Sequence, residues 1–172
     1  AKQKNDIQDW YYRSAKHSPS GFLKSKIVNQ DIKMDELVEK ARKLQPGLIV
    51  VDRAVKGKNQ NYLTPENTVP KESLPYPWES CIIAGGGWGW VFNPQYKSSH
   101  NLVHMLIDIV CKGGNLLLNI GPSPEGIWPD DAYNRLNDIG DWMKINSEAI
   151  YETRAIAPFK EDKICFTNKK NT

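Results

Sequence analysis

The sequence is poor in the features that mark several common classes of protein. Its 172 residues include only three cysteines, Cys81, Cys111 and Cys165, which are far apart and odd in number. Neither a disulfide framework nor a zinc-binding spacing is therefore indicated. No apolar run approaches the roughly 20 residues of a membrane-spanning helix. The net charge of +3 is scattered along the chain, without the basic stripe that binds nucleic acid. We expect no nucleic-acid partner and no insertion into a membrane.

Two further motifs are incomplete. The glycines at 85–87 and 113–114 are not followed by the Lys-Ser/Thr pair of a phosphate-binding loop, so we interpret them as tight turns. His100 and His104 are four residues apart and share a helix face, but the glutamate of the H-E-x-x-H motif is replaced by Asn101. A metalloprotease is accordingly not favoured.

The sequence does contain a repeated alternation of helix and strand. Apolar residues at helical spacing predict helices over 34–44, 102–110 and 133–143, the first ended by Gln45-Pro-Gly47. Apolar runs predict strands over 48–51, 81–84 and 116–120, and we expect the first to be buried on both faces. Such spacing is typical of βα repeats in a parallel sheet. A complete eight-stranded barrel takes about 250 residues, so these units do not close one. An open doubly wound sheet could be complete at this size, but the glycine-rich turns do not follow the first strand in the G-x-G-x-x-G arrangement.

Carboxylates and indole rings follow the strands. They occur in Asn61-Tyr-Leu-Thr-Pro-Glu66, Tyr76-Pro-Trp-Glu79 and Gly87-Trp-Gly-Trp90. Carboxylates transfer protons, and aromatic rings contact the apolar faces of sugars. This combination favours a carbohydrate-active enzyme.

These motifs, in this order, resemble the glycoside hydrolase family 29 α-L-fucosidases. The closest likeness is to the branch that acts on α-1,3/1,4-linked fucose, and it covers about residues 28–168. The motifs that carry it are Gln45-Pro-Gly-Leu-Ile-Val-Val-Asp-Arg53, Thr64-Pro-Glu66, Tyr76-Pro-Trp-Glu-Ser-Cys81, Gly87-Trp-Gly-Trp90, Tyr96-Lys-Ser98 and Lys112-Gly-Gly-Asn-Leu-Leu-Leu-Asn-Ile-Gly-Pro122.

The resemblance implies an α/β fold, a partial TIM-like (β/α) barrel with the start of a C-terminal β-sandwich. Residues 1–155 would be the C-terminal part of the (β/α)8-like catalytic domain, and residues 156–172 a linker and the first strand of a truncated sandwich. The implied activity is retaining hydrolysis of terminal α-L-fucose from a fucosylated oligosaccharide, without a metal or organic cofactor. The family also suggests an extracellular or periplasmic location.

Retaining glycosidases use two carboxyl groups, one as the acid/base and one as the nucleophile. The resemblance assigns the acid/base to Glu66, which would need a raised pKa, with Trp78 or Trp88 as candidates for its desolvation. The nucleophile would be an aspartate at the end of an earlier apolar strand. Only Asp6 and Asp9 precede the matching region, and neither follows an apolar run. We therefore expect the chain to be a fragment that lacks the nucleophile and is inactive alone.

The resemblance also suggests a substrate-binding set, namely Arg53, Trp78, Glu79, Trp88 and Trp90. Each has a structural alternative: a salt bridge with Asp52 for Arg53, packing for Glu79, and core packing for the tryptophans. We interpret Asn115 and Asn119 as residues that hold loops in place. Two other functions remain open, a non-catalytic fucose-binding protein and a purely structural βα fragment.

Overall fold

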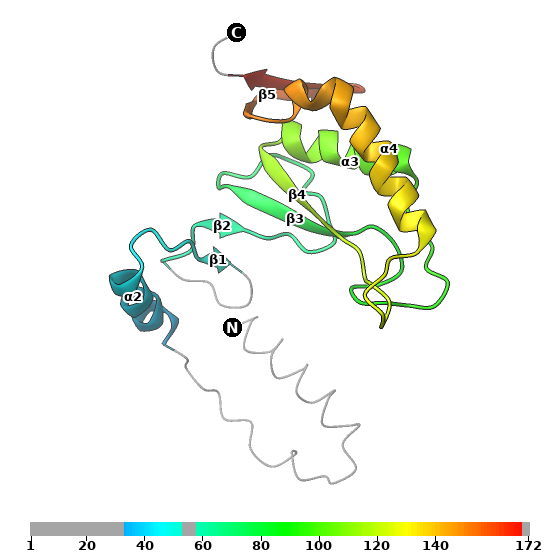
Figure 1. Ribbon diagram of the computed structural model, residues 1–172. Helices are drawn as coiled ribbons and strands as arrows, with labels where there is room; N and C mark the ends of the chain where they lie inside the picture. The colour runs from blue at the N-terminus through cyan, green and yellow to red at the C-terminus, as the bar shows by residue number, and fades with distance from the viewer. Residues whose placement is uncertain (1–32, 53–57, 170–172) are drawn as a thin grey trace. The chain divides into compact units, whose positions relative to one another are not determined.

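The structure is a computed structural model that describes residues 33–52 and 58–169 (Figure 1). The chain divides into two compact units, residues 1–61 and 62–172, and each is described by itself. In the first unit, the helix α2 spans Met34–Leu44 and the short strand β1 spans Val51–Asp52. The bounds of α2 agree with the apolar spacing, and its C-cap is Gln45, immediately before the Pro-Gly pair.

The prediction of a strand over residues 48–51 that is buried on both faces is wrong. Ile49 is 68% exposed, and strand geometry is limited to Val51 and Asp52. Side chains bind the backbone here: the Asn61 amide oxygen accepts from the Val50 nitrogen at 2.9 Å, and Arg42 Nε donates to the Leu48 carbonyl at 3.2 Å. These polar partners satisfy the backbone groups that a longer strand would have paired with a neighbouring strand.

The second unit is built on three parallel strands in the order β2-β3-β4. Its elements are β2 (Tyr62–Leu63), β3 (Trp78–Ile83), α3 (Ser99–Cys111), β4 (Gly114–Asn119), α4 (Asp130–Asn146), the short 3-10 helix η2 (Ser147–Ala149), β5 (Thr153–Glu161) and β6 (Ile164–Lys169). Helix α3 connects β3 to β4, as a βαβ unit requires for parallel neighbours. The predicted alternation of strand and helix is confirmed in this unit, and the chain is of the α/β class.

The two faces of this sheet differ in burial. Trp78, Ser80 and Ile82 on one face of β3 are all buried, whereas the alternate residues are only half-buried. Register pairs Glu79 with Asn115, Cys81 with Leu117 and Ile83 with Asn119, and paired residues of parallel strands lie on the same face. We call the face that carries these three pairs the open face. Leu117 on it is 49% exposed.

Helices cover the opposite face of the sheet. Helix α3 packs on β4, and α4 packs on α3 (Figure 1). The hydroxyl of Ser98 caps α3 by accepting from the Asn101 nitrogen at 3.2 Å. The buried side chains of α3 complete the core with those of β3: Leu102, Val103, Ile109 and Cys111.

The C-terminal part forms an antiparallel hairpin of β5 and β6, which contacts α3. Strand β6 lies within residues 156–172, where the first strand of a sandwich was expected, and it is the second strand of the hairpin because β5 precedes it. Neither a closed barrel nor a β-sandwich is seen within the described residues, so both stay predictions. None of the helices described is long and apolar enough to cross a lipid bilayer.

Candidate functional site

Glu66 lies beside β3, in the segment that follows β2. The Asn67 nitrogen donates to the Cys81 carbonyl at 2.8 Å, and the Cys81 nitrogen donates to the Pro65 carbonyl at 3.3 Å. These bonds make an isolated parallel bridge between Glu66 and Cys81. Since bridged residues of parallel segments share a face, Glu66 stands on the open face.

Asn67 fixes this segment in a second way. Its φ is 48°, in the left-handed region, which asparagine tolerates better than most residues. Its side-chain oxygen accepts from the Ile83 nitrogen at 3.3 Å. Sequence reasoning missed Asn67, although an asparagine directly after Thr-Pro-Glu is the residue type that such a turn favours.

Glu79 shares the open face with Glu66. Glu66 pairs with Cys81, so Glu79 lies two residues nearer the amino end of the neighbouring strand. Strand spacing places the two Cα atoms roughly 8 Å apart. Glu79 is half-buried and Glu66 is exposed. The sheet thus brings two carboxylates to one surface, together with the side chain of Asn115.

The loop after β3 presents aromatic rings at the carboxyl end of the sheet. Trp88 and Trp90 are 42% and 44% exposed, so neither is a core residue. Trp90 packs edge-on against Phe92, with ring centroids 6.4 Å apart. Phe92 was not singled out from the sequence, and its exposed side chain extends the aromatic surface. An exposed pair of rings at this position is suited to contact with a sugar face.

The two strand-end loops support one another. The Asn119 amide donates to the Trp88 carbonyl at 3.0 Å, so the prediction that Asn119 holds a loop is confirmed. A Cβ atom on Gly121 would lie 2.4 Å from the carbonyl carbon of Gly89. A Cβ atom on Gly85 would lie 2.6 Å from the Gln95 carbonyl oxygen. These contacts require glycine and agree with the interpretation of the glycine-rich segment as a tight turn.

Trp78 occupies a different place from the other tryptophans. It is 1% exposed, begins β3 at its amino end, and its ring lies directly over Gly114. Its face of the sheet is the one opposite Glu66, so Trp78 does not desolvate that carboxyl group. Trp78 packs in the core of this unit, and its contact with a substrate stays a prediction.

Arg53 lies outside the described residues, as does the side chain of Asp52. The alternatives for Arg53, a salt bridge and a sugar contact, both stay predictions. Asp6 and Asp9, the early carboxylates, also lie outside the described part of the chain.

Two groups of side chains offer possible metal ligands. The exposed rings of His100 and His104 stack on α3 with centroids 4.0 Å apart, as their spacing predicts. Asp108, Cys111 and Cys165 form the one cluster of three or more potential ligands in the part of the chain that the structure describes. Neither group lies on the open face beside Glu66.

Comparisons with known proteins agree on one family. The family model described as Alpha-L-fucosidase matches residues 3–148. The plasma alpha-L-fucosidase of Rattus norvegicus is 43% identical over 88 residues, which are 49% of this chain and 19% of that protein. The chain therefore spans about a fifth of the length of this curated relative.

Among the solved structures that resemble this one are two fucosidases. Alpha-L-fucosidase isoenzyme 1 from Paenibacillus thiaminolyticus has a TM-score of 0.73 and 31% identity, over 79% of this chain and 36% of that one. The alpha-fucosidase of Thermotoga maritima in complex with fucose has a TM-score of 0.62 and 30% identity, over 73% and 28% of the two chains.

Proposed function

This chain belongs to the alpha-L-fucosidase family, and on that premise we propose that it supplies the acid/base half of a site that hydrolyses terminal α-L-fucose. The observation that carries the proposal is the position of Glu66. Two backbone hydrogen bonds, which join Pro65 and Asn67 to Cys81, fix it on the open face. Catalytic groups of parallel barrels gather at the carboxyl ends of the strands, where Glu66 and the tryptophan loop both lie.

Each side chain has a distinct role in this proposal. Glu66 donates a proton to the leaving oxygen and then takes one from water. Trp88 and Trp90 form an aromatic wall against the sugar, and Glu79 accepts hydrogen bonds from its hydroxyl groups. Arg53 donates to a fucose hydroxyl or to the nucleophile. The fucose bound by the Thermotoga maritima relative supports this choice of ligand.

The side chain of Glu66 is exposed within the chain. A general acid that works near neutral pH needs a raised pKa, which requires removal from water. The proposal therefore requires groups beyond the described residues, or the bound sugar itself, to enclose Glu66. The nucleophile likewise belongs to residues that the structure does not describe.

The finer assignments extend the same proposal. We place the chain in the branch acting on α-1,3/1,4-linked fucose, within a retaining enzyme whose barrel includes residues 1–155. Residues 156–172 would then open a β-sandwich, and the antiparallel pairing of β5 with β6 supports that assignment. Comparing α-1,2- with α-1,3/1,4-linked substrates tests the branch, and the anomer first released, observed by NMR, tests retention.

The decisive experiment is Glu66→Gln in a protein that contains this chain within the complete family domain. Hydrolysis of an oligosaccharide with a poor leaving group should fall by about 10²–10⁴, the usual contribution of general acid catalysis. An aryl fucoside with a good leaving group should be affected much less, because its departure needs little protonation.

Glu72→Gln is the matched control, since Glu72 is an exposed glutamate in the connection between β2 and β3, and it should leave both rates unchanged. Equal losses on the two substrates would assign Glu66 a structural role and refute the proposal.

A non-catalytic fucose-binding protein is the second candidate. The described part of the open face favours it. Strand pairing places two carboxylates on that face, Glu66 and Glu79. Neither of them follows an apolar strand, as the expected nucleophile would. Calorimetric titration with fucose separates the two functions. Binding without turnover by the complete domain would favour the binding protein, and turnover would exclude it.

A further inference from the structure

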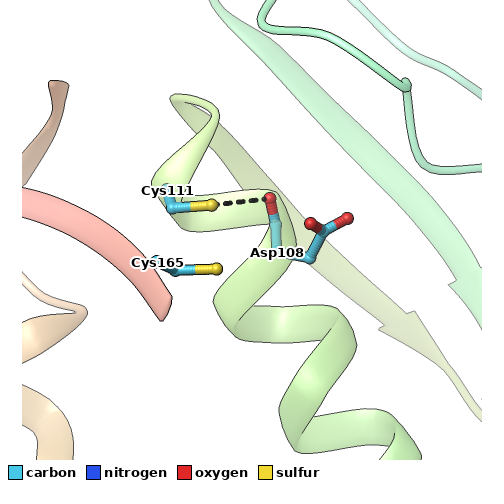
Figure 2. A group of neighbouring side chains, drawn as sticks. All are labelled: Asp108, Cys111 and Cys165. Carbon is cyan, nitrogen blue, oxygen red and sulfur yellow. Dashed lines mark hydrogen bonds between the residues drawn. The ribbon is translucent and has the colours of Figure 1, made fainter. Parts of the chain in front are cut away.

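Two cysteines from distant parts of the sequence lie close together where α3 contacts β6. Cys111 ends α3 and is fully buried, and Cys165 lies half-buried on β6. Their sulfur atoms and a carboxylate oxygen of Asp108 all lie within 4.8 Å of one another (Figure 2). The Cys111 thiol also donates to the backbone carbonyl of Asp108 at 3.3 Å. The two cysteines are 54 positions apart in the sequence (111 to 165), and nothing in the sequence indicated this contact.

A metal ion is the first alternative for such a cluster. Lys112 Nζ lies 2.7 Å from one carboxylate oxygen of Asp108, and Lys160 Nζ lies 3.6 Å from the other. A divalent cation would have to displace or approach two ammonium groups to bind this carboxylate. Two sulfur ligands would then remain, whereas structural zinc sites use four protein ligands. The charge of Asp108 is matched by lysines, which leaves the two sulfurs facing each other.

We propose that Cys111 and Cys165 form a disulfide bond that fastens the C-terminal hairpin to α3. The reaction is thiol–disulfide exchange with a low-molecular-weight disulfide, for which glutathione disulfide is the probe. The Cys165 thiolate attacks one glutathione sulfur and releases one glutathione thiolate, which takes up a proton. Cys111 then loses its proton and attacks Cys165 Sγ, releasing a second glutathione. One disulfide is reduced to two thiols while the protein dithiol is oxidised.

The order of the two steps follows from burial. Cys165 is the more accessible thiol, so it meets the reagent first. Burial, the hydrogen bond with Cys165 and the charge of Asp108 raise the pKa of Cys111 to about 12, against a smaller opposing effect of Lys112. Because the thiolate is the nucleophile, ring closure by Cys111 is slow at neutral pH and quickens with added base.

The bond would stabilise the contact between the hairpin and α3, which otherwise depends on packing and on the ion pair of Lys160 with Asp108. The hairpin contacts α3 through both of its strands. Closing a loop of this length removes conformational freedom from the unfolded chain. For a chain of this size, the oxidised form should melt about 10 °C above the reduced form.

The test is peptide mapping of the full chain after incubation with glutathione disulfide and alkylation of the remaining thiols in denaturant. We expect one linked pair of peptides, containing Cys111 and Cys165, with Cys81 alkylated. Cys81→Ser should keep the link and the rise in Tm, whereas Cys165→Ser should abolish both.

A chain that does not fold would give a different set of linked cysteines, so the test also distinguishes a folded chain from an unfolded one. Cys81 and Cys111 are 30 positions apart (81 to 111), against 54 for the proposed pair (111 to 165). Loop-closure entropy then favours the Cys81–Cys111 link about twofold in an unfolded chain, and the same oxidation in guanidinium provides this reference.

If the Cys81–Cys111 link predominated without denaturant, as it should in the unfolded chain, the proposal would be overturned. Mixed disulfides with glutathione that never close would overturn it as well. So would stoichiometric zinc binding that protects both thiols from alkylation when glutathione disulfide forms no link.

Discussion

Gly121 gives the sharpest test of how the two strand-end loops fit together. A Cβ atom on Gly121 would lie 2.4 Å from the carbonyl carbon and oxygen of Gly89 and 2.7 Å from the Trp90 nitrogen. All three are backbone atoms, so no side-chain rotation relieves the overlap and one loop has to move. Overpacking of a well-packed site costs about 1–3 kcal/mol. Because the obstacle is backbone, we expect Gly121→Ala to lower the free energy of unfolding by about 3 kcal/mol.

This loss should be visible in thermal unfolding of the full chain, followed by far-ultraviolet circular dichroism. About 3 kcal/mol corresponds to a fall in Tm of roughly 6–12 °C at this chain length. Gly140→Ala is the matched control, because Gly140 lies inside α4 and, apart from the adjacent helix backbone, no atom lies within 4 Å of its added Cβ. Alanine favours a helix interior over glycine by about 1 kcal/mol, so this control should melt slightly higher. A Gly121→Ala chain that melts at the wild-type temperature would refute the close contact of the two loops.

Three further predictions follow from buried or strained groups. Trp78→Ala should lower the free energy of unfolding by about 3–5 kcal/mol. Trp78→Phe should cost less because it keeps an aromatic ring in the core and loses only part of the indole, including a buried N–H with no hydrogen-bond partner among the described residues; urea titrations would contradict this if both variants lost the same amount. Asn67→Ala should lower the free energy of unfolding by about 1–2 kcal/mol, because it places alanine at a positive φ and removes the hydrogen bond from the Ile83 nitrogen. Asn67→Gly should recover part of this loss in the same titrations. A glycine variant less stable than the alanine variant would contradict the strain argument. The raised pKa of Cys111 means that the folded chain holds the thiol proton more tightly than the unfolded chain. The free energy of unfolding should therefore fall as the pH rises from 9.0, the ordinary pKa of a cysteine thiol, to about 12. Cys111→Ala should lack that part of the pH dependence.

Local patterns in the sequence were sufficient for the helices and for two of the strands. Apolar residues at helical spacing and the Pro-Gly pair gave the bounds of α2, since both signals act over a few residues. The same patterns failed for residues 48–50, which have the composition of a buried strand. Their backbone groups are bound by the side chains of Arg42 and Asn61, and contacts between such polar residues leave no periodic signal in the sequence.

The candidate site shows the same division. The exposure of Trp88 and Trp90 agrees with their position between glycines, because a loop of that kind cannot fill a core. The burial of Trp78 depends on the register that brings it opposite Gly114, and register between distant strands is set by the whole sheet. Strand β5 was missed because Thr153–Glu161 contains a proline and several charged residues, which are uncommon in strand interiors.

The open face has a practical consequence for anyone who prepares this chain. Leucine, isoleucine and cysteine side chains on it give water an apolar surface at the centre of a sheet, and surfaces of this kind promote self-association. Concentrated samples should therefore bind hydrophobic dyes and sediment as mixtures of species. Dilute samples with a mild solubilising additive are the conditions under which the stability of a single chain can be measured.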